Sequence, residues 1–159
     1  MATIYRAENT DESERLQNIT KALEAIAREI PVVLPLHPRT RKCLAINHIQ
    51  LEYVHQIEPV GYFDMITLLS NCRGVFTDSG GVQKEAYFFG KPCVTLREET
   101  GWVELVEHGY NFLARADYGR ILDAEARIRG NILGFWVPLY GDGNAGWKIV
   151  QILLESIIV

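Results

Sequence analysis

The feature that most constrains the fold is a short apolar run followed by a glycine pair and a helix-forming stretch, at residues 75–86. The run suits a buried strand, and Gly80 and Gly81 permit a tight turn with close approach to the backbone. The free amides and positive dipole end of the helix, with the Ser79 hydroxyl, would converge on one anionic group without a metal. Glu85 lies one turn further on, where its carboxylate can accept hydrogen bonds from a sugar diol. The stretch therefore predicts a ribose diphosphate site.

Simpler explanations of the same residues exist. Asp78 or Ser79 can be an N-cap, the glycines can serve only the turn, and Glu85 can be a solvated helix residue. The stretch has neither the Gly-x-Gly-x-x-Gly of a dinucleotide site nor the Gly-Lys-Ser/Thr of a P-loop. Residues 78–81 match part of a serine-protease signature, but the flanking residues differ. A phosphate cradle and a simple capped turn therefore both remain open at this point.

The amino-terminal part predicts strands alternating with helices. A strand at residues 3–5 precedes a capping-box signature at 11–14, and apolar residues then recur every three or four positions over residues 16–30. Pro31 ends this helix, and residues 32–36 form a continuous apolar run typical of a parallel sheet. Strand, helix and strand in this order imply a right-handed crossover and an α/β fold.

His37, Pro38 and Arg39 follow that strand, where a helix over residues 38–47 begins. Ligands of open α/β sheets bind outside the carboxyl ends of strands, so His37 and Arg39 would suit an anion. The simpler explanation is that His37 caps the helix and Pro38 starts it. The rest of the chain predicts strands at 51–56, 92–96 and 111–114, the last at a sheet edge, and helices at 63–71, 102–108, 119–129 and 145–158.

A charged loop, residues 97–102, follows the strand at 92–96. Arg97 comes first, at the carboxyl end of that strand and next to a predicted phosphate cradle that needs a cation. A loop arginine is by default solvent-exposed. Its place after a buried strand favours anion binding instead.

Composition excludes several classes of partner. A net charge of −4 without a basic run argues against nucleic acid, because binding to a phosphate backbone needs clustered Lys and Arg. Cys43, Cys72 and Cys93 have no metal-ligand spacing, as expected of reduced thiols that fill core space in a cytoplasmic protein. The apolar carboxyl-terminal stretch is too short to span a bilayer. We therefore expect a soluble protein with no metal, cofactor, nucleic-acid or membrane partner.

The final predicted helix is apolar almost all round, which is more than one face of a small domain can hide. Phe135 and Trp136 add to this surplus. We expect the helix to contact an absent amino-terminal domain, a second copy of the chain, or both. Its apolar residues are Trp147, Ile149, Val150, Ile152, Leu153, Leu154, Ile157 and Ile158.

Seven motifs, in chain order, resemble the non-hydrolysing UDP-N-acetylglucosamine 2-epimerases. They are IYRAENT (4–10), LHPRT (36–40), EPVGYFDM (58–65), TDSGGVQKEA (77–86), GKPCVTLR (90–97), WVELV (102–106) and YGDGNA (140–145). They span nearly the whole chain but correspond to only the C-terminal half of such an enzyme. The resemblance therefore implies one UDP-binding Rossmann-like domain over residues 1–159, with the N-terminal half of the family enzyme absent.

The resemblance also implies a mechanism. The family has a glycosyltransferase-B-like fold with its site between two Rossmann-like halves, and it inverts C2 of the sugar by eliminating UDP to a glycal and adding UDP back to the other face. Stabilising the departing diphosphate is the electrostatic share of catalysis. The residues implied in UDP binding are Val60, Tyr62 and Met65 near uracil, Ser79, Gly80 and Gly81 on the diphosphate, Glu85 on ribose, and Arg97 as a further anion partner.

Three departures from the family pattern limit this expectation. The family's proton-moving carboxylates lie in the absent half. The family has a histidine near the pyrophosphate where this chain has Tyr5, which cannot carry positive charge at neutral pH. Gly101 replaces the glutamate of the family's Thr-Glu before Trp102. We expect the chain alone to bind UDP weakly or not at all and to show no epimerase activity. The Trp102-Val103-Glu104 motif leaves open whether the sugar is UDP-N-acetylglucosamine or a UDP-diacetamido-uronic acid.

Two alternatives belong to other classes of function. The chain can be an excised or engineered domain, altered at Tyr5, Gly101, Trp136 and Trp147, that acts as a self-associating scaffold. It can also be a serine hydrolase in which Ser79 is the nucleophile and His55 or His37 is the base. Labelling by an active-site serine probe would distinguish the hydrolase from the nucleotide site.

Overall fold

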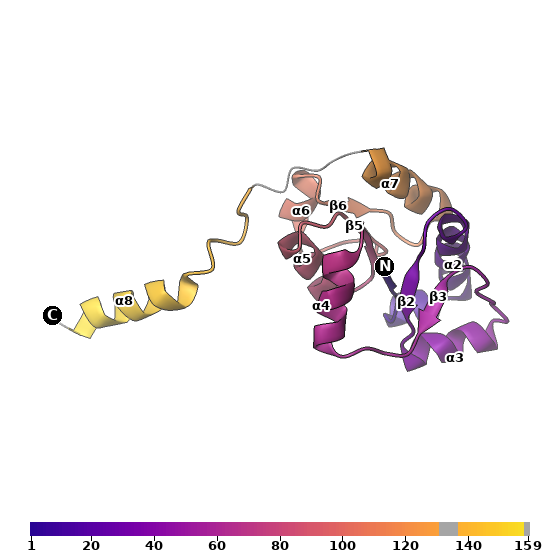
Figure 1. The fold of residues 1–159 in the computed structure, drawn as a ribbon, viewed down its shortest axis with the longest axis horizontal. Coiled ribbons are helices and arrows are strands. Elements are labelled where there is room, and N and C mark those ends of the chain that lie inside the picture. Colours follow the sequence, from indigo (N-terminus) through magenta and orange to yellow (C-terminus); the bar gives the residue numbers. More distant parts are fainter. Residues whose placement is uncertain (131–136, 158–159) are drawn as a thin grey trace.

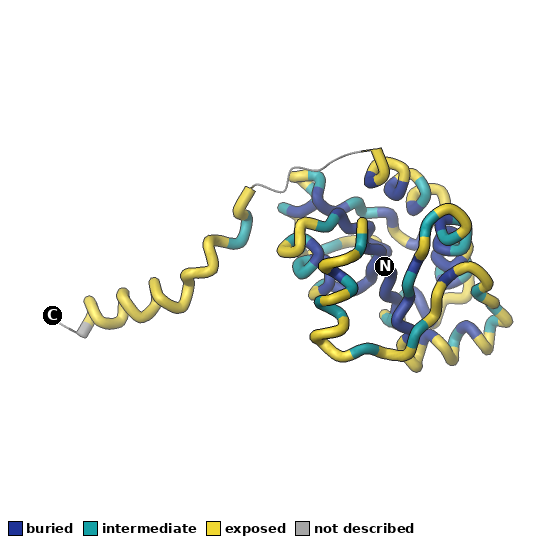
Figure 2. Tube along the Cα trace, in the orientation of Figure 1, coloured by how far each residue is buried: buried dark blue, intermediate teal, exposed yellow. Residues whose placement is uncertain are grey.

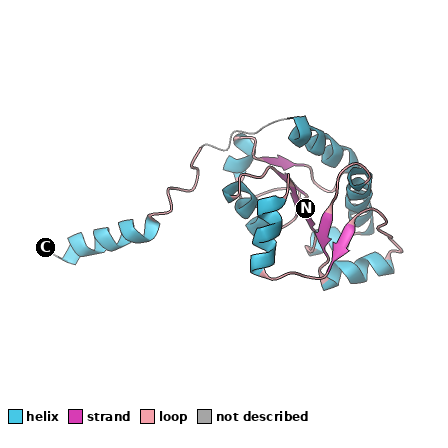
Figure 3. Cartoon of the chain, viewed as in Figure 1, coloured by secondary structure: helices cyan, strands magenta, loops and turns pink. Residues whose placement is uncertain are grey.

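The computed structural model describes residues 1–130 and 137–157 and alternates short strands with longer helices (Figures 1 and 3). The strands are β1 (Ala2–Thr3), β2 (Val33–Pro35), β3 (His55–Ile57), β4 (Val75–Thr77), β5 (Cys93–Thr95) and β6 (Asn111–Leu113). The helices are α1 (Ala7–Thr10), α2 (Ser13–Ala27), α3 (Pro38–Ile46), α4 (Tyr62–Asn71), α5 (Gly80–Phe88), α6 (Val103–Glu107), α7 (Tyr118–Gly130) and α8 (Ala145–Ile157).

All strand pairs are parallel, as the predicted α/β fold requires. Strands β1, β4, β5 and β6 form one sheet in that order, and β2 pairs with β3. Strand β1 also contacts β2, so the six strands follow the Rossmann order β3-β2-β1-β4-β5-β6. The predicted edge position of β6 is confirmed. The strand order reverses between β1 and β4, and folds of this type bind ligands beyond the carboxyl ends of the strands at such a point.

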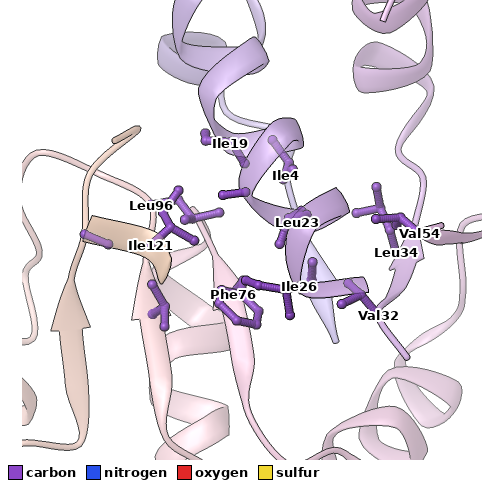
Figure 4. Close-up of a cluster of buried hydrophobic side chains, with 14 of the residues drawn as sticks. Ile4, Ile19, Leu23, Ile26, Val32, Leu34, Val54, Phe76, Leu96 and Ile121 are labelled. Atoms are coloured by element: carbon purple, nitrogen blue, oxygen red, sulfur yellow. The ribbon is translucent and has the colours of Figure 1, made fainter. Parts of the chain in front are cut away.

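Helices cover both faces of the sheet, because successive strand side chains point to opposite faces. Phe76 and Val94 join a large apolar cluster with α2 and α7, whereas their neighbours Val75 and Cys93 join a smaller one with α4 and α5. Figure 4 shows the large cluster, in which Leu23 of α2 and residues of several strands pack together. The predicted spacing of three and four in α2 is confirmed by four buried side chains, Leu16, Ile19, Leu23 and Ile26.

Several expected boundaries differ from the structure, since β1 is Ala2–Thr3 and not 3–5, and α2 ends at Ala27 and not at residue 30. Two further differences involve long-range contacts. The capping box at residues 11–14 does not form, because α2 begins at Ser13 and the Asp11 carboxylate instead binds the Arg39 guanidinium. The strand expected at 51–56 is reduced to β3, since the Glu24 carboxylate accepts the backbone amides of residues 53 and 54.

Helix α8 lies apart from the other elements in Figure 1, and Figure 2 shows its described residues as exposed. Trp147 is 66% exposed and Ile152 62%, so the predicted apolar surplus has no covering element in the described parts of the chain. Phe135, Trp136 and Ile158, named in the same prediction, lie outside the described residues. None of the described helices has the length and hydropathy needed to cross a membrane.

Candidate diphosphate site at the strand-order reversal

The loops that follow β1 and β4 meet at a buried carboxylate, Asp78. Its oxygens accept the backbone amides of Tyr5 at 3.1 Å and Arg6 at 3.0 Å and the side-chain amide of Asn9 at 3.2 Å. Asn9 also donates to the Leu96 carbonyl at 2.8 Å, which adds the loop after β5. Burial raises the pKa of Asp78, and these hydrogen bonds oppose the rise. Asp78 thus joins three strand ends at one place.

Ser79 is the N-cap of α5. Its Oγ accepts the Val82 amide at 3.3 Å, so Ser79 rather than Asp78 is the cap among the two residues considered from sequence. The Tyr5 hydroxyl donates to the same oxygen at 2.8 Å. The structure therefore brings together Tyr5 and Ser79, two of the predicted site residues, from loops on either side of the reversal.

The next two amides, those of Gly80 and Gly81, have no acceptor within residues 1–130 and 137–157. Neither glycine has a positive φ. A Cβ added at Gly80 would first meet Trp102 Nε1 at 3.9 Å, and one added at Gly81 would meet Ser79 Oγ at 3.8 Å, both ordinary contacts. The backbone and its surroundings therefore do not require glycine for the turn. What the missing side chains provide is uncovered backbone at the helix N-terminus.

The loop after β5 is fixed to the start of α5 by contacts that the sequence analysis missed. The Trp102 indole donates to the Gly80 carbonyl at 2.7 Å, and Thr100 donates to the buried Gln83 side chain at 2.7 Å. Lys84 Nζ lies 4.5 Å from the centre of the Trp102 ring and 4.3 Å from that of Tyr140. Lys84, Trp102 and Tyr140 each lie in one of the motifs named above, but nothing in the sequence indicated that they meet.

Three basic residues considered for anion binding have acidic or local partners instead. Arg97 donates from Nε and Nη2 to Glu8 at 3.3 Å each. Arg39 donates to Asp11 and Thr10, and His37 accepts the Arg39 amide as the N-cap of α3. The capping explanation of His37 is confirmed. An incoming phosphate would have to compete with Glu8 for Arg97.

The residues implied for uracil and ribose lie on α4, on the turn before it, and on α5. Tyr62 is 64% exposed at the start of α4, Val60 is half-buried in the preceding turn, and Met65 packs against the smaller apolar cluster. Glu85 is half-buried on α5, one turn after the uncovered amides. Tyr62 is therefore open to a ligand ring, whereas Met65 is partly used in packing.

The structure provides no base for a nucleophilic Ser79. In the described part of the chain, the partners of Ser79 Oγ are Tyr5 and Val82 and include no histidine. His55 is exposed on β3, and in the strand order β2 and β1 lie between β3 and β4. The hydrolase alternative remains a prediction without a supporting contact.

Comparison with known proteins identifies the family. The family model described as UDP-N-acetylglucosamine 2-epimerase matches residues 1–154. The chain belongs to this family. It is 49% identical over 156 residues to the UDP-2,3-diacetamido-2,3-dideoxy-D-glucuronate 2-epimerase of Pseudomonas aeruginosa, a match that covers 98% of this chain and 44% of that protein. It is also 36% identical to the UDP-N-acetylglucosamine 2-epimerase of Methanocaldococcus jannaschii, covering 96% of this chain and 43% of that one.

Solved structures of epimerases in this family share the fold. The M. jannaschii UDP-GlcNAc 2-epimerase superposes with a TM-score of 0.89 at 35% identity, over 97% of this chain and 45% of that one. A complex of the same enzyme with UDP-GlcNAc and UDP gives a TM-score of 0.85 at 34% identity, over 97% and 44% of the two chains. The chain therefore spans less than half the length of the epimerases that it matches, and the glycosyltransferase-B-like assignment of its fold is confirmed.

Proposed function

We propose that this chain is the UDP-binding half of an epimerase that inverts C2 of a UDP-linked 2-acetamido sugar by eliminating UDP and adding it back. Both relatives named above act, by their names, at C2 of such a sugar, and one of the two structures of the M. jannaschii enzyme holds UDP-GlcNAc and UDP. In this scheme the chain grips the leaving UDP, and the carboxylates that move the C2 proton come from the part of the relatives that the chain does not span.

The observation that carries the proposal is the pair of uncovered Gly80 and Gly81 amides at the strand-order reversal. Two backbone amides without an acceptor, beside a hydroxyl, suit the oxygens of a diphosphate, and the helix dipole adds to the attraction. The remaining UDP contacts follow the family resemblance. They are the ribose on Glu85, the uracil beside Val60, Tyr62 and Met65, and a phosphate oxygen on Arg97.

We further propose that α8 binds the part of the enzyme that this chain does not span. Its apolar side chains are exposed, whereas a helix that is apolar almost all round is normally buried against other elements. A second copy of the chain is the competing partner, and it is the one favoured by the scaffold alternative. Light scattering on the purified chain separates the two, because only the second gives a dimer or larger species of the chain alone.

The test of UDP binding is a titration of the ¹⁵N-labelled chain with UDP, followed by amide chemical shifts. We expect weak, millimolar binding, since residues 1–159 supply only one side of the proposed cleft, with the largest shifts at Gly80 and Gly81. Uridine at the same concentration is the control, because it keeps the base and ribose but has no phosphate. Shifts of equal size with uridine, or no shifts at these two amides with UDP, would refute the proposed site.

A further inference from the structure

We propose that Tyr5 is a positioning residue, which turns the Ser79 hydroxyl proton outward toward the phosphate oxygens of the bound ligand. This inference rests on the proposed function. It assigns to Tyr5 an indirect role, through Ser79, in place of the direct charge that a histidine at this position would bring.

The first step is the hydrogen-bond capacity of Ser79. A hydroxyl oxygen can accept two hydrogen bonds and donate one. Both acceptor positions are taken, one by the Tyr5 hydroxyl at 2.8 Å and the other by the Val82 amide at 3.3 Å. The proton of Ser79 is therefore what this hydroxyl can still offer to a ligand, and its direction is fixed by the two bonds that the oxygen accepts. A hydroxyl in this state donates to an anion and is poorly suited to attack a carbon atom.

The second step is that Tyr5 is held in place independently of Ser79. The Tyr5 backbone amide donates to Asp78, and the same carboxylate binds the amide of Arg6 and the side chain of Asn9. Its ring lies 5.7 Å from the His37 ring, centre to centre. Removal of the Tyr5 hydroxyl should therefore leave the backbone around it unchanged and release only the orientation of Ser79.

The third step joins Ser79 to the neighbouring amides. Because Val82 is the third residue of α5 and its amide is already capped, the helix presents two uncovered amides, those of Gly80 and Gly81. An outward Ser79 proton adds a third donor to these two. Three preorganised donors suit a phosphoryl group better than two donors and a freely rotating hydroxyl, because no orientation has to be fixed on binding.

The experiment is a double-mutant cycle on UDP affinity, measured by amide shifts, with Tyr5→Phe, Ser79→Ala and the double variant. Tyr5→Phe should weaken UDP binding by about three- to tenfold, the range for one hydrogen bond. Ser79→Ala should weaken it at least as much. The double variant should bind no more weakly than Ser79→Ala alone, because Tyr5 acts only through that hydroxyl. Tyr118→Phe, an exposed tyrosine on α7, is the matched control and should bind as the unaltered chain does.

Two results overturn the inference while the proposed function stands. One is a Tyr5→Phe variant that binds UDP as tightly as the unaltered chain. The other is a double variant whose loss equals the product of the two single losses, which would mean that Tyr5 contacts the ligand itself. An unaltered chain without UDP-dependent shifts at Gly80 and Gly81 overturns both the inference and the proposed function. Amide spectra of each variant without ligand establish that the fold is retained.

Discussion

Burial and hydrogen bonding have opposite effects on the pKa of the Asp78 carboxylate. Burial is the larger effect and raises its pKa above the usual 3.8, while bonds from Arg6, Asn9 and Tyr5 oppose the rise. The folded chain therefore binds this proton more tightly than the unfolded chain does. The stability that Asp78 contributes is fully present below pH 3.8 and is lost as the pH rises through the folded-state pKa.

Asp78→Asn removes this titration, so its stability relative to the unaltered chain should increase as the pH rises from 3.8 through the range in which folded Asp78 loses its proton. Urea unfolding of both proteins across this range measures the difference. Asp123→Asn, the same substitution at an exposed position on α7, is the matched control. A relative stability of Asp78→Asn that decreases with pH would mean that the hydrogen bonds outweigh burial.

A substitution at Gly81 should weaken UDP binding without destabilising the fold. A methyl group there would meet nothing closer than Ser79 Oγ at 3.8 Å, and the residue has no positive φ. Gly81→Ala should therefore leave the free energy of unfolding within about 1 kcal/mol of the original, or raise it, since alanine favours a helix. The same methyl group would cover the amides offered to the diphosphate, so UDP affinity should fall about tenfold, the equivalent of one charge-assisted hydrogen bond.

Gly130→Ala serves as the control for Gly81→Ala, since a methyl group at Gly130, in α7, would meet nothing within 4 Å. Thermal unfolding and UDP titration of both variants test the prediction. Unchanged UDP affinity in Gly81→Ala, with the fold intact, would show that these amides do not contact the ligand.

At the scale of elements, local patterns were sufficient where an element's own side chains decide its structure. Each of three patterns predicted the right element. They are the spacing of three and four in α2, the apolar run of β2 and the glycine pair that begins α5. The errors came from distant partners. Asp11 binds Arg39, 28 positions away, instead of capping the helix. Tyr5 and Ser79 are 74 positions apart in the sequence, so no local pattern could reveal their contact. Family resemblance named both residues of that pair, but only the fold showed that they touch.

Helix α8 carries the clearest prediction about an element. Replacing Ile149 and Leu153 with glutamate should leave thermal unfolding of the rest of the chain within about 2 °C, because both side chains are more than half exposed. The same change should weaken any association through α8, which sedimentation analysis measures. Gln151→Glu, on the polar side of the helix, is the control for added charge. Lower thermal stability in the double variant would place α8 against the domain, and unchanged association would point to another surface.

At the scale of the whole molecule, the proposed leaving-group site belongs to a chain that spans only 44% of the P. aeruginosa epimerase. Binding of UDP would stabilise the departing diphosphate, yet elimination also needs a base at C2. Proton transfer by a positioned base increases a reaction rate by about 10²- to 10⁴-fold. We therefore expect no turnover of UDP-N-acetylglucosamine or its diacetamido-uronate counterpart by the chain alone, followed by NMR of the C2 epimers.

The complementary experiment adds the part of the relatives that this chain does not span. The N-terminal portion of the P. aeruginosa relative, fused ahead of this chain, should cover α8 and complete the cleft, since the two proteins are 49% identical over the shared part. We expect epimerisation to return in the fusion and to fall again when Gly81 is replaced by alanine within it, because the leaving diphosphate then loses its amides. Activity in the unfused chain would contradict the division of labour between the halves. A folded but inactive fusion that regains turnover with Tyr5→His would instead locate the deficit in the exchange of the family histidine for Tyr5, since the two fusions differ only in that side chain.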